Sequence, residues 1–288
     1  MIRLVAFDLD GTVLNGIGQA SEASVEAIRA LVDAGVAVAS ISGRNTEKSQ
    51  APFAGVPELA AAMYIGSYNG AVVLGPAVDG SRRLLHEQRL SSGVFQEVVD
   101  YIGERGLSFV YCRYEVAEGR MQEDYMTDRN TASVQGLMAL TGVRFVINGN
   151  LLSRIEAGEL GPPPKLIVMP GPQRRDVVLE EMQEVFGQRL YLARTGDDRV
   201  EAMHPEVNKG RALRTICETC GVSLAQTLAV GDGDNDLPML REAGVGVLVQ
   251  SADEQTVRLA ADAGLEMAPS LEAEGFSKVV EQYALDGR

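Results

Sequence analysis

Two aspartates, Asp8 and Asp10, stand two residues apart at the end of an apolar stretch over residues 2–7. The stretch predicts a buried strand, and a buried strand end is a costly place for unpaired negative charge. A hard cation such as Mg²⁺ would offset that cost, because it takes oxygen ligands and often binds carboxylates together with a substrate phosphate. Gly11 allows a sharp turn after the pair, and the Thr12 hydroxyl can fix the loop by a local hydrogen bond.

A second acidic cluster, Gly-Asp-Gly-Asp-Asn-Asp over residues 231–236, follows the apolar stretch 227–230. Its alternating aspartates also occur in the Ca²⁺ loop of an EF-hand, which needs Gly at its sixth position and Glu at its twelfth. Leu237 and Ala243 occupy those positions here. The cluster is therefore not an EF-hand loop.

Lys209 stands in the first turn of a helix predicted over residues 208–220, directly after the favourable N-cap residue Asn208. A lysine there opposes the helix macrodipole and costs a few tenths of a kcal/mol to about 1 kcal/mol. The neighbouring Gly210 is a poor helix former as well. A nearby bound anion would explain both residues, since the ammonium meets the charge and the glycine lets the backbone approach.

The elements that must position these residues alternate between strand and helix. Strands are predicted over residues 2–7, 36–41, 63–65, 227–230 and 245–249, and helices over residues 21–32, 46–53, 208–220, 252–263 and 277–285. This alternation predicts an α/β fold with right-handed crossovers and a mostly parallel sheet. Ligands bind at the carboxyl ends of such strands, where the sequence places Asp8, Ser42-Gly43-Arg44 and the second acidic cluster. Asn69-Gly70 predicts a hairpin-like turn.

The pattern changes between residues 90 and 194, which predict a separate α+β unit. Helices are expected over residues 92–102, 134–140 and 174–186, and strands over residues 109–114, 165–169 and 190–193. We expect residues 1–88 and 195–288 to form the two parts of the core, with residues 89–194 inserted between them. The stretch 200–203 is predicted as the first strand of the second core part.

Composition limits the classes of function. The chain has 288 residues and a net charge of −14, so it carries no electrostatic footprint for nucleic acid or for an anionic membrane. No apolar run approaches the ~20 residues of a transmembrane helix. Three cysteines cannot form a disulfide framework, and a cytoplasmic location is the simplest expectation. Cys217 and Cys220 form a CxxC on an apolar helix face and are expected to be buried and inert. The oligomeric state stays open.

The four clusters, taken in order, resemble the motifs of the haloacid dehalogenase-like (HAD) phosphohydrolases. They are Asp8-Leu9-Asp10-Gly11-Thr12, Ser42-Gly43-Arg44, Lys209 and Gly231-Asp232-Gly233-Asp234-Asn235-Asp236. The long insert is similar to the C2 (IIB-type) cap of the Cof-type subfamily, and Asn69-Gly70-Ala71 also looks Cof-like. The resemblance implies a Rossmann-like three-layer core and a Mg²⁺-dependent phosphatase that acts on a small phosphorylated metabolite, most simply a sugar phosphate.

The same resemblance implies a role for each motif residue. Asp8 would attack phosphorus and form an aspartyl phosphate, and Asp10 would protonate the leaving group and then activate water. Ser42, the Gly43 amide, Lys209 and Asn235 would contact the phosphate. The metal would be held by Asp8, the Asp10 backbone carbonyl and Asp232, with Asp236 supporting its shell. Arg44 and Thr12 could orient the substrate.

Several alternatives stay open from the sequence alone. A sucrose-phosphate-like or mannosyl-3-phosphoglycerate-like phosphatase would share this cap class, as would a phosphomutase. A catalytically silent phosphometabolite-binding module is a different class of function. Gln250 stands where Cof-like chains commonly carry Asn, which puts fine substrate placement in doubt. The substrate itself and the residues of the insert that select it cannot be derived from one sequence.

Overall fold

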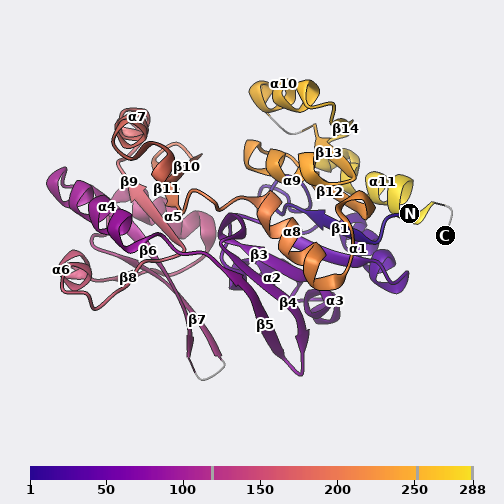
Figure 1. The fold of residues 1–288 in the computed structure, drawn as a ribbon, viewed down its shortest axis with the longest axis horizontal. Helices are drawn as coiled ribbons and strands as arrows, with labels where there is room; N and C mark the ends of the chain where they lie inside the picture. Colours follow the sequence, from indigo (N-terminus) through magenta and orange to yellow (C-terminus); the bar gives the residue numbers. More distant parts are fainter. Residues whose placement is uncertain (118–119, 251–252, 287–288) are drawn as a thin grey trace. The chain divides into compact units, whose positions relative to one another are not determined.

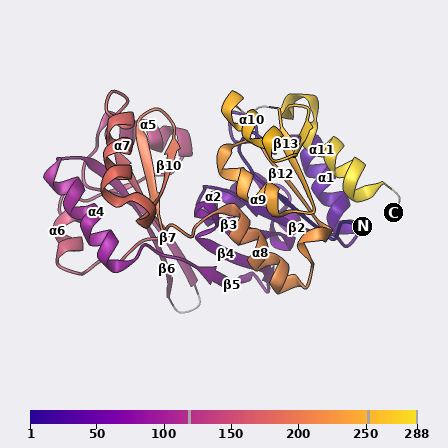
Figure 2. The ribbon, with the colours of Figure 1, turned by 45° about the horizontal axis from the view of Figure 1, so that its top comes forward.

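The computed structural model describes residues 1–117, 120–250 and 253–286. The chain divides into two compact units, one formed by Met1–Glu87 with Asn208–Arg288 and the other by Gln88–Val207. Each unit has its own sheet (Figures 1 and 2). Among the described helices, none combines the length and the apolar character that crossing a membrane requires.

The first unit is built on an eight-stranded sheet in the order β14-β13-β12-β1-β2-β3-β4-β5. Its strands are β1 (Leu4–Phe7), β2 (Ala37–Ile41), β3 (Tyr64–Ser67), β4 (Val72–Val78), β5 (Ser81–Glu87), β12 (Thr227–Gly231), β13 (Val245–Val249) and β14 (Glu266–Ala268). The pairs from β14 to β3 are parallel, and the β3–β4 and β4–β5 pairs are antiparallel. The predicted mostly parallel sheet is therefore confirmed.

Helices cover both faces of this sheet. They are α1 (Glu22–Asp33), α2 (Thr46–Gln50), α3 (Pro57–Ala62), α8 (Lys209–Cys220), α9 (Leu237–Glu242), α10 (Glu254–Asp262) and α11 (Gly275–Val280). Because side chains alternate along a strand, Val5 and Phe7 of β1 pack with α1 and α11, and Leu4 and Ala6 pack with α8 and α9. The predicted three-layer Rossmann-like core follows from this alternation.

The second unit is built on a six-stranded sheet in the order β10-β11-β9-β6-β7-β8. Its elements are α4 (Ser92–Glu104), β6 (Ser108–Ala117), β7 (Arg120–Thr127), α5 (Ala132–Thr141), β8 (Val146–Ile147), α6 (Leu151–Glu156), β9 (Lys165–Met169), α7 (Arg175–Phe186), β10 (Tyr191–Thr195) and β11 (Arg199–Met203). Apolar side chains of α4, α6 and α7 pack on one face of the sheet. This is the predicted α+β unit.

The end of the second unit differs from the expected boundary after residue 194. Strand β11 was expected to open the second core part, but it pairs with β9 and β10 in the six-stranded sheet. Val200 and Ala202 of β11 are buried in the apolar core of that unit. The unit therefore extends to Val207, because strand pairing and burial, and not chain order alone, decide where β11 belongs.

Three neighbouring strands carry the motifs. Phe7 at the end of β1 lies beside Val230 of β12 and Ser40 of β2 in parallel register. Asp8, Ser42 and Asp232 follow these three strands directly. Since parallel strands end at the same edge, the register alone brings the three loops together.

Candidate active site

Asp8, Lys209 and Asp236 form a buried cluster at the carboxyl edge of the eight-stranded sheet. The Lys209 Nζ atom lies 2.5 Å from Asp8 Oδ1 and 2.5 Å from Asp236 Oδ1. Lys209 is the first residue of α8, and Asn208 caps that helix by accepting a hydrogen bond from the Arg211 amide. The lysine that opposes the helix dipole is thus held by two carboxylates.

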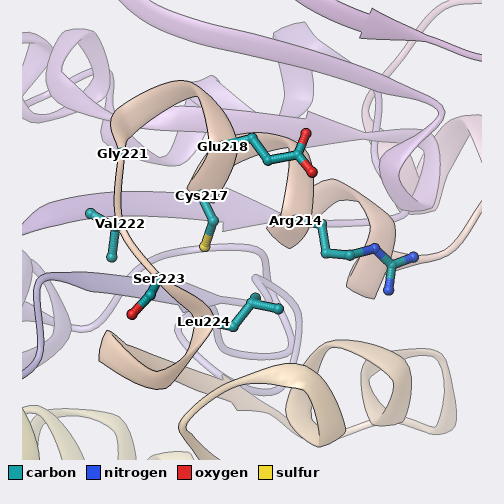
Figure 3. A pocket seen from close by; sticks show the side chains of 7 residues that line it. All are labelled: Arg214, Cys217, Glu218, Gly221, Val222, Ser223 and Leu224. Carbon is teal, nitrogen blue, oxygen red and sulfur yellow. The ribbon is translucent and has the colours of Figure 1, made fainter.

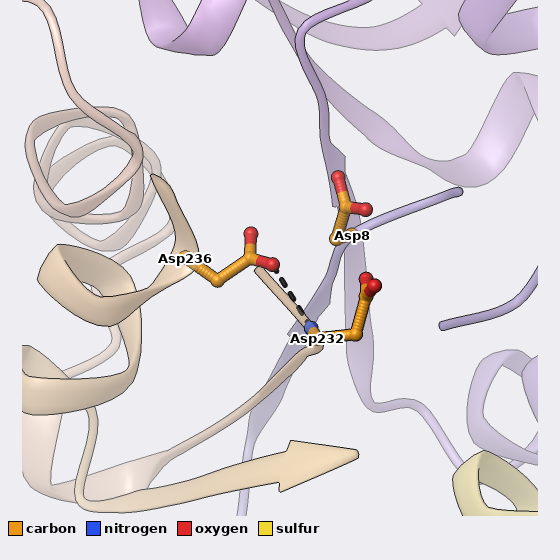
Figure 4. A group of neighbouring side chains, drawn as sticks. All are labelled: Asp8, Asp232 and Asp236. Carbon is orange, nitrogen blue, oxygen red and sulfur yellow. Dashed lines mark hydrogen bonds between the residues drawn. The ribbon is translucent and has the colours of Figure 1, made fainter. Parts of the chain in front are cut away.

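Asp232 completes the acidic group (Figure 4). Its Oδ1 atom accepts a hydrogen bond of 3.0 Å from the hydroxyl of Thr12, which is fully buried. Thr12 therefore positions a carboxylate of a distant loop, whereas its place in the sequence suggested a local hydrogen bond within its own loop or a contact that orients the substrate. Gly11 has a φ of +80°, and a Cβ added there would lie 2.3 Å from Asp232 Oδ2. Glycine is needed at this turn because both the backbone angle and the approach of Asp232 exclude a side chain.

Asp236 fixes the second acidic loop. Its Oδ2 atom accepts hydrogen bonds from the amides of Asp232 at 3.0 Å and Gly233 at 2.9 Å, as Figure 4 shows for Asp232. Its Oδ1 atom is taken by Lys209. One side chain thus ties the loop after β12 to Lys209, and a support of the metal shell by Asp236 stays a prediction.

The electrostatics of the cluster show an excess of negative charge. Burial raises the pKa of Asp8 well above its ordinary value, and the neighbouring carboxylates add to the rise against the opposing effect of Lys209. Burial also raises the pKa of Asp232, to about 6, with repulsion from Asp236 as the next cause. For Lys209 burial acts downward, but Asp236 and Asp8 outweigh it and leave the pKa above its usual value. One ammonium does not balance three carboxylates.

The donor set fits a hard divalent cation. Asp8, Asp232 and Asp236 each offer a carboxylate oxygen, and these atoms lie within 4.8 Å of one another. No other group of three such side chains occurs among the described residues. Oxygen ligands of this kind are the ones that Mg²⁺ takes in proteins, and added positive charge would offset the burial and the repulsion that raise the carboxyl pKa values.

Asp10 and Arg44 form a separate ion pair beside the cluster. The Arg44 guanidinium donates to both oxygens of the Asp10 carboxylate, at 2.7 and 2.5 Å. The Asp10 side chain is 56% exposed, and so it faces solvent where the neighbouring Asp8 is buried. Arg44 therefore pairs with this acid, and both Asp10 oxygens are engaged by the guanidinium.

Ser42, Gly43 and Asn235 lie in the loops that follow β2 and β12. The Ser42 hydroxyl is buried and accepts a hydrogen bond of 3.3 Å from the Arg44 amide. Asn235 donates from Nδ2 to Asn69 Oδ1 at 3.1 Å. Asn69 was recognised in the sequence only as part of a Cof-like turn. The positive φ that Asn-Gly pairs favour was the available signal, but nothing in the sequence links residues 69 and 235.

Gly210 and Gln250 are the remaining residues for which the sequence suggested a role at the site. Gly210 was expected to give an anion close access, but a Cβ there would lie 2.8 Å from the Pro238 carbonyl oxygen. Its role is therefore the close packing of α8 on α9. Gln250 is exposed, and its backbone N–H donates to the Ala268 carbonyl oxygen. Ser251 and Ala252, which belong to the same departure from the family pattern, lie outside the described residues.

A hollow of about 390 Å³ lies at the C-terminal end of α8, and its lining differs in chemistry from the acidic cluster (Figure 3). Arg214, Cys217, Glu218 and Leu224 are among its lining residues. Burial raises the pKa of the Cys217 thiol to about 12, which keeps it protonated and unreactive at neutral pH. Cys217 is buried as expected, whereas Cys220, expected to be buried with it, is only partly buried. Nothing that lines this hollow matches the convergent carboxylates of the acidic cluster.

Solved structures share the fold over nearly the whole chain. A Thermotoga maritima protein superimposes with a TM-score of 0.81 at 23% identity, covering 99% of each chain. A sugar phosphatase of HAD subclass IIB superimposes with a TM-score of 0.77 at 17% identity, covering 98% of this chain and 99% of its own. These likenesses confirm the predicted fold class with its core and inserted unit.

Sequence comparisons identify the family. The HMP-PP phosphatase of Cronobacter sakazakii is 25% identical over 255 residues, which is 88% of this chain and 86% of that protein. The 5-amino-6-(5-phospho-D-ribitylamino)uracil phosphatase of Bacillus subtilis is 24% identical over 292 residues, with 99% and 96% covered. The haloacid dehalogenase-like hydrolase family matches residues 5–278. The chain therefore belongs to the haloacid dehalogenase-like hydrolases and is an enzyme of the phosphoric monoester hydrolase class, as the sequence predicted.

Proposed function

We propose that this enzyme is a Mg²⁺-dependent phosphatase that hydrolyses a small phosphorylated metabolite, in the first place a sugar phosphate, through an aspartyl phosphate on Asp8. The observation that carries the proposal is the buried Asp8, held 2.5 Å from Lys209 and close to Asp232 and Asp236. The sugar phosphatase among the structural relatives supports the substrate class. The phosphatases among the sequence relatives support a small phosphorylated substrate.

Asp8 has the position that a nucleophile requires. It is fixed at the end of β1 by the sheet on one side and by Lys209 on the other. Attack by one of its oxygens on phosphorus would form the new P–O bond as the P–O bond to the leaving group breaks. Held by Asp8 and Asp232, Mg²⁺ would offset the repulsion between the carboxylate and the phosphate when it is bound.

Asp10 is the acid and base of the proposal. The leaving oxygen would take its proton from the Asp10 carboxyl, and a water molecule would later return a proton to Asp10 while attacking phosphorus. That second attack breaks the P–O bond to Asp8 and releases inorganic phosphate. The role requires Arg44 to release an Asp10 oxygen, and the exposure of the Asp10 side chain leaves room for a leaving group and water.

The phosphate oxygens need donors during the transfer. Lys209 provides an ammonium that stays protonated in this environment, and the Ser42 hydroxyl and Gly43 amide stand on the loop after β2. Asn235 adds a side-chain amide from the loop after β12. Fixed donors of this kind stabilise the charge that develops on the transferring group.

The test is phosphate release from p-nitrophenyl phosphate with and without Mg²⁺. We expect activity that EDTA removes and Mg²⁺ restores, and a loss of at least about 10³-fold in Asp8→Asn, because the amide is a poor nucleophile. Asp234→Asn is the matched control, since Asp234 is exposed on the same acidic loop. It should retain wild-type turnover.

The same assay separates the alternatives. Equal activity in Asp8→Asn would exclude the nucleophile, and a wild-type protein without turnover on p-nitrophenyl phosphate or on a panel of phosphorylated metabolites would indicate a silent binding module. A panel in which sugar phosphates are not preferred would reject the substrate class alone. Transfer of the phosphoryl group back to substrate, without net release, would indicate a phosphomutase.

A further inference from the structure

A short turn between β3 and β4 carries an unusual backbone. Tyr68, Asn69 and Gly70 have φ angles of 52°, 57° and 95°. A non-glycine residue with positive φ costs of the order of 1 kcal/mol, and such residues persist only where their surroundings hold them. Tyr68 is fully buried, so this turn is an inner part of the unit and not a loose connection.

The backbone of the turn is tied to the loop after β2. The Asn69 amide donates to the Ser42 carbonyl oxygen at 2.9 Å, and the Tyr68 amide donates to the Arg44 carbonyl oxygen at 2.9 Å. Both acceptors belong to the Ser42-Gly43-Arg44 segment. The strained turn therefore fixes the segment that the proposed function uses to hold phosphate oxygens.

The side chain of Asn69 reaches further along the same edge. It is buried, and its Oδ1 atom accepts the hydrogen bond from Asn235 and lies 3.3 Å from the place of a Cβ on Gly43. Strands β2 and β12 flank β1 in the sheet. One amide thus touches the loops on both sides of the strand end that carries Asp8.

The turn also packs against the start of α8. A Cβ on Gly70 would lie 2.9 Å from both the Asn208 carbonyl oxygen and the Ala212 Cβ. Asn208 is the N-cap before Lys209. Residues 68–70 therefore contact three of the four segments that converge on the acidic cluster.

We propose that Asn69 is a positioning residue, which fixes the distance between the Ser42–Gly43 loop and Asn235 and so keeps both sides of the phosphate site in register. The inference rests on the proposed function. Asparagine suits the place for two reasons. It tolerates positive φ better than other side chains, and its neutral amide offers an acceptor to Asn235 without adding a carboxylate to an already acidic site.

The expected effect is on turnover. Loss of a contact that orients a site residue commonly costs 10–100-fold in activity, because small misplacements of a donor reduce transition-state stabilisation. Asn69→Gly keeps the backbone free to adopt positive φ and removes only the amide. We expect kcat on p-nitrophenyl phosphate to fall by about 10–100-fold, with a melting temperature within a few degrees of wild type.

A matched control separates the side chain from the backbone. Asp79 also has a positive φ, 51°, and lies exposed in the turn between β4 and β5. Asp79→Gly should leave kcat and KM unchanged.

A second variant tests the acceptor. Asn69→Asp keeps an acceptor for Asn235, so its kcat should be closer to wild type than that of Asn69→Gly, while its KM for the anionic substrate rises. A role confined to folding would not produce this split.

A double-mutant cycle tests the contact itself. If Asn69 acts through Asn235, the pair Asn69→Gly with Asn235→Ala should be no slower than the slower single variant, because coupled residues are not additive. The proposal would be overturned by a double variant whose loss of kcat equals the product of the two single losses. It would also be overturned by wild-type kcat in Asn69→Gly.

Phosphate binding keeps this result apart from the question of activity. Calorimetry with inorganic phosphate and Mg²⁺ should show weaker binding to Asn69→Gly than to wild type or Asp79→Gly. If wild type binds phosphate but has no turnover, the proposed function fails and the ratio of affinities still decides the role of Asn69. Equal affinities would reject that role, and a wild type that binds no phosphate would reject both proposals.

Discussion

Each of the two units buries a lysine against carboxylates, and among the described residues only the cluster in the first unit brings three carboxylates within 4.8 Å of one another. In the second unit Lys165 of β9 pairs with Glu201 of β11 at 2.9 Å. In the first unit Lys209 shares Asp8 and Asp236, and Asp232 stands close by. Both lysines are almost fully buried.

This difference distinguishes a structural ion pair from a cluster that binds a ligand. A buried ion pair can often be replaced by apolar residues at little cost, and so by itself it indicates no ligand. A buried group with excess negative charge is unfavourable by itself. The cluster around Lys209 therefore implies a positive ligand, whereas the pair of Lys165 and Glu201 does not.

Replacement of the two lysines should give the largest difference in turnover between the two clusters. Lys209→Met should lower kcat on p-nitrophenyl phosphate by about 10³-fold, since a fixed donor to the developing charge is worth 10²–10³-fold or more. The double variant Lys165→Met with Glu201→Leu should keep turnover within about threefold. Steady-state kinetics on folded protein measure both. Equal losses in the two variants would show that the convergence of three carboxylates does not distinguish the clusters.

The second unit should show the stability pattern of a structural pair. Lys165→Met alone leaves Glu201 buried without its partner and should destabilise the protein by about 3 kcal/mol. Adding Glu201→Leu should recover most of that loss, because both charges are then gone. Urea unfolding measures the difference. A double variant as unstable as the single one would mean that the pair has a further role.

A divalent cation should stabilise the first unit only through its acidic group. At a Mg²⁺ concentration of 100 times the dissociation constant, binding to the native state adds about 2.7 kcal/mol. Thermal unfolding with Mg²⁺ and with EDTA measures the shift. Asp232→Asn should lose the shift and Asp234→Asn should keep it; a shift that survives Asp232→Asn would place the ion elsewhere.

The excess charge should also appear as a pH dependence of the metal-free protein. Folding raises the pKa of Asp232 from its ordinary value near 3.8 to about 6, so the native state binds the proton more tightly than the unfolded state. Its contribution to stability is complete below pH ~4 and is lost as the pH rises to about 6. Asp8 acts in the same direction.

We expect Asp232 to contribute a loss of about 3 kcal/mol for wild type between pH 4 and pH 7 in EDTA, because each unit of pKa difference corresponds to about 1.4 kcal/mol. Urea midpoints measure it, and Asp232→Asn should show a smaller loss than Asp234→Asn. If metal-free wild type becomes more stable over this range and Asp232→Asn follows the same curve, the acidic group does not carry excess charge.

Much of the site could be predicted because a parallel sheet has few degrees of freedom. Once β1, β2 and β12 were recognised from their apolar runs, the register required Asp8, Ser42 and Asp232 to share an edge. The unfavourable place of Lys209 at a helix start was a second local signal. Both are properties of short segments, which a single sequence reports well.

The remaining features depend on contacts between distant segments. Strand β7 carries alternating polar residues and gave no apolar run, although it pairs with β6 along most of its length. Strand β11 was recognised as a strand, but its partners β9 and β10 could not be read from the sequence. The contact of Asn69 with Asn235 and the pairing of Arg44 with Asp10 are likewise tertiary.

The central claim is that the buried carboxylate of Asp8 receives the phosphoryl group. Quenching the enzyme in acid during turnover with Mg²⁺ and substrate, followed by mass spectrometry of its peptides, tests this most directly. The account predicts a phosphorylated peptide that contains residues 8–12, absent in EDTA and absent in Asp8→Asn. A phosphoryl group on another residue, or the same phosphorylated peptide in Asp8→Asn, would contradict it.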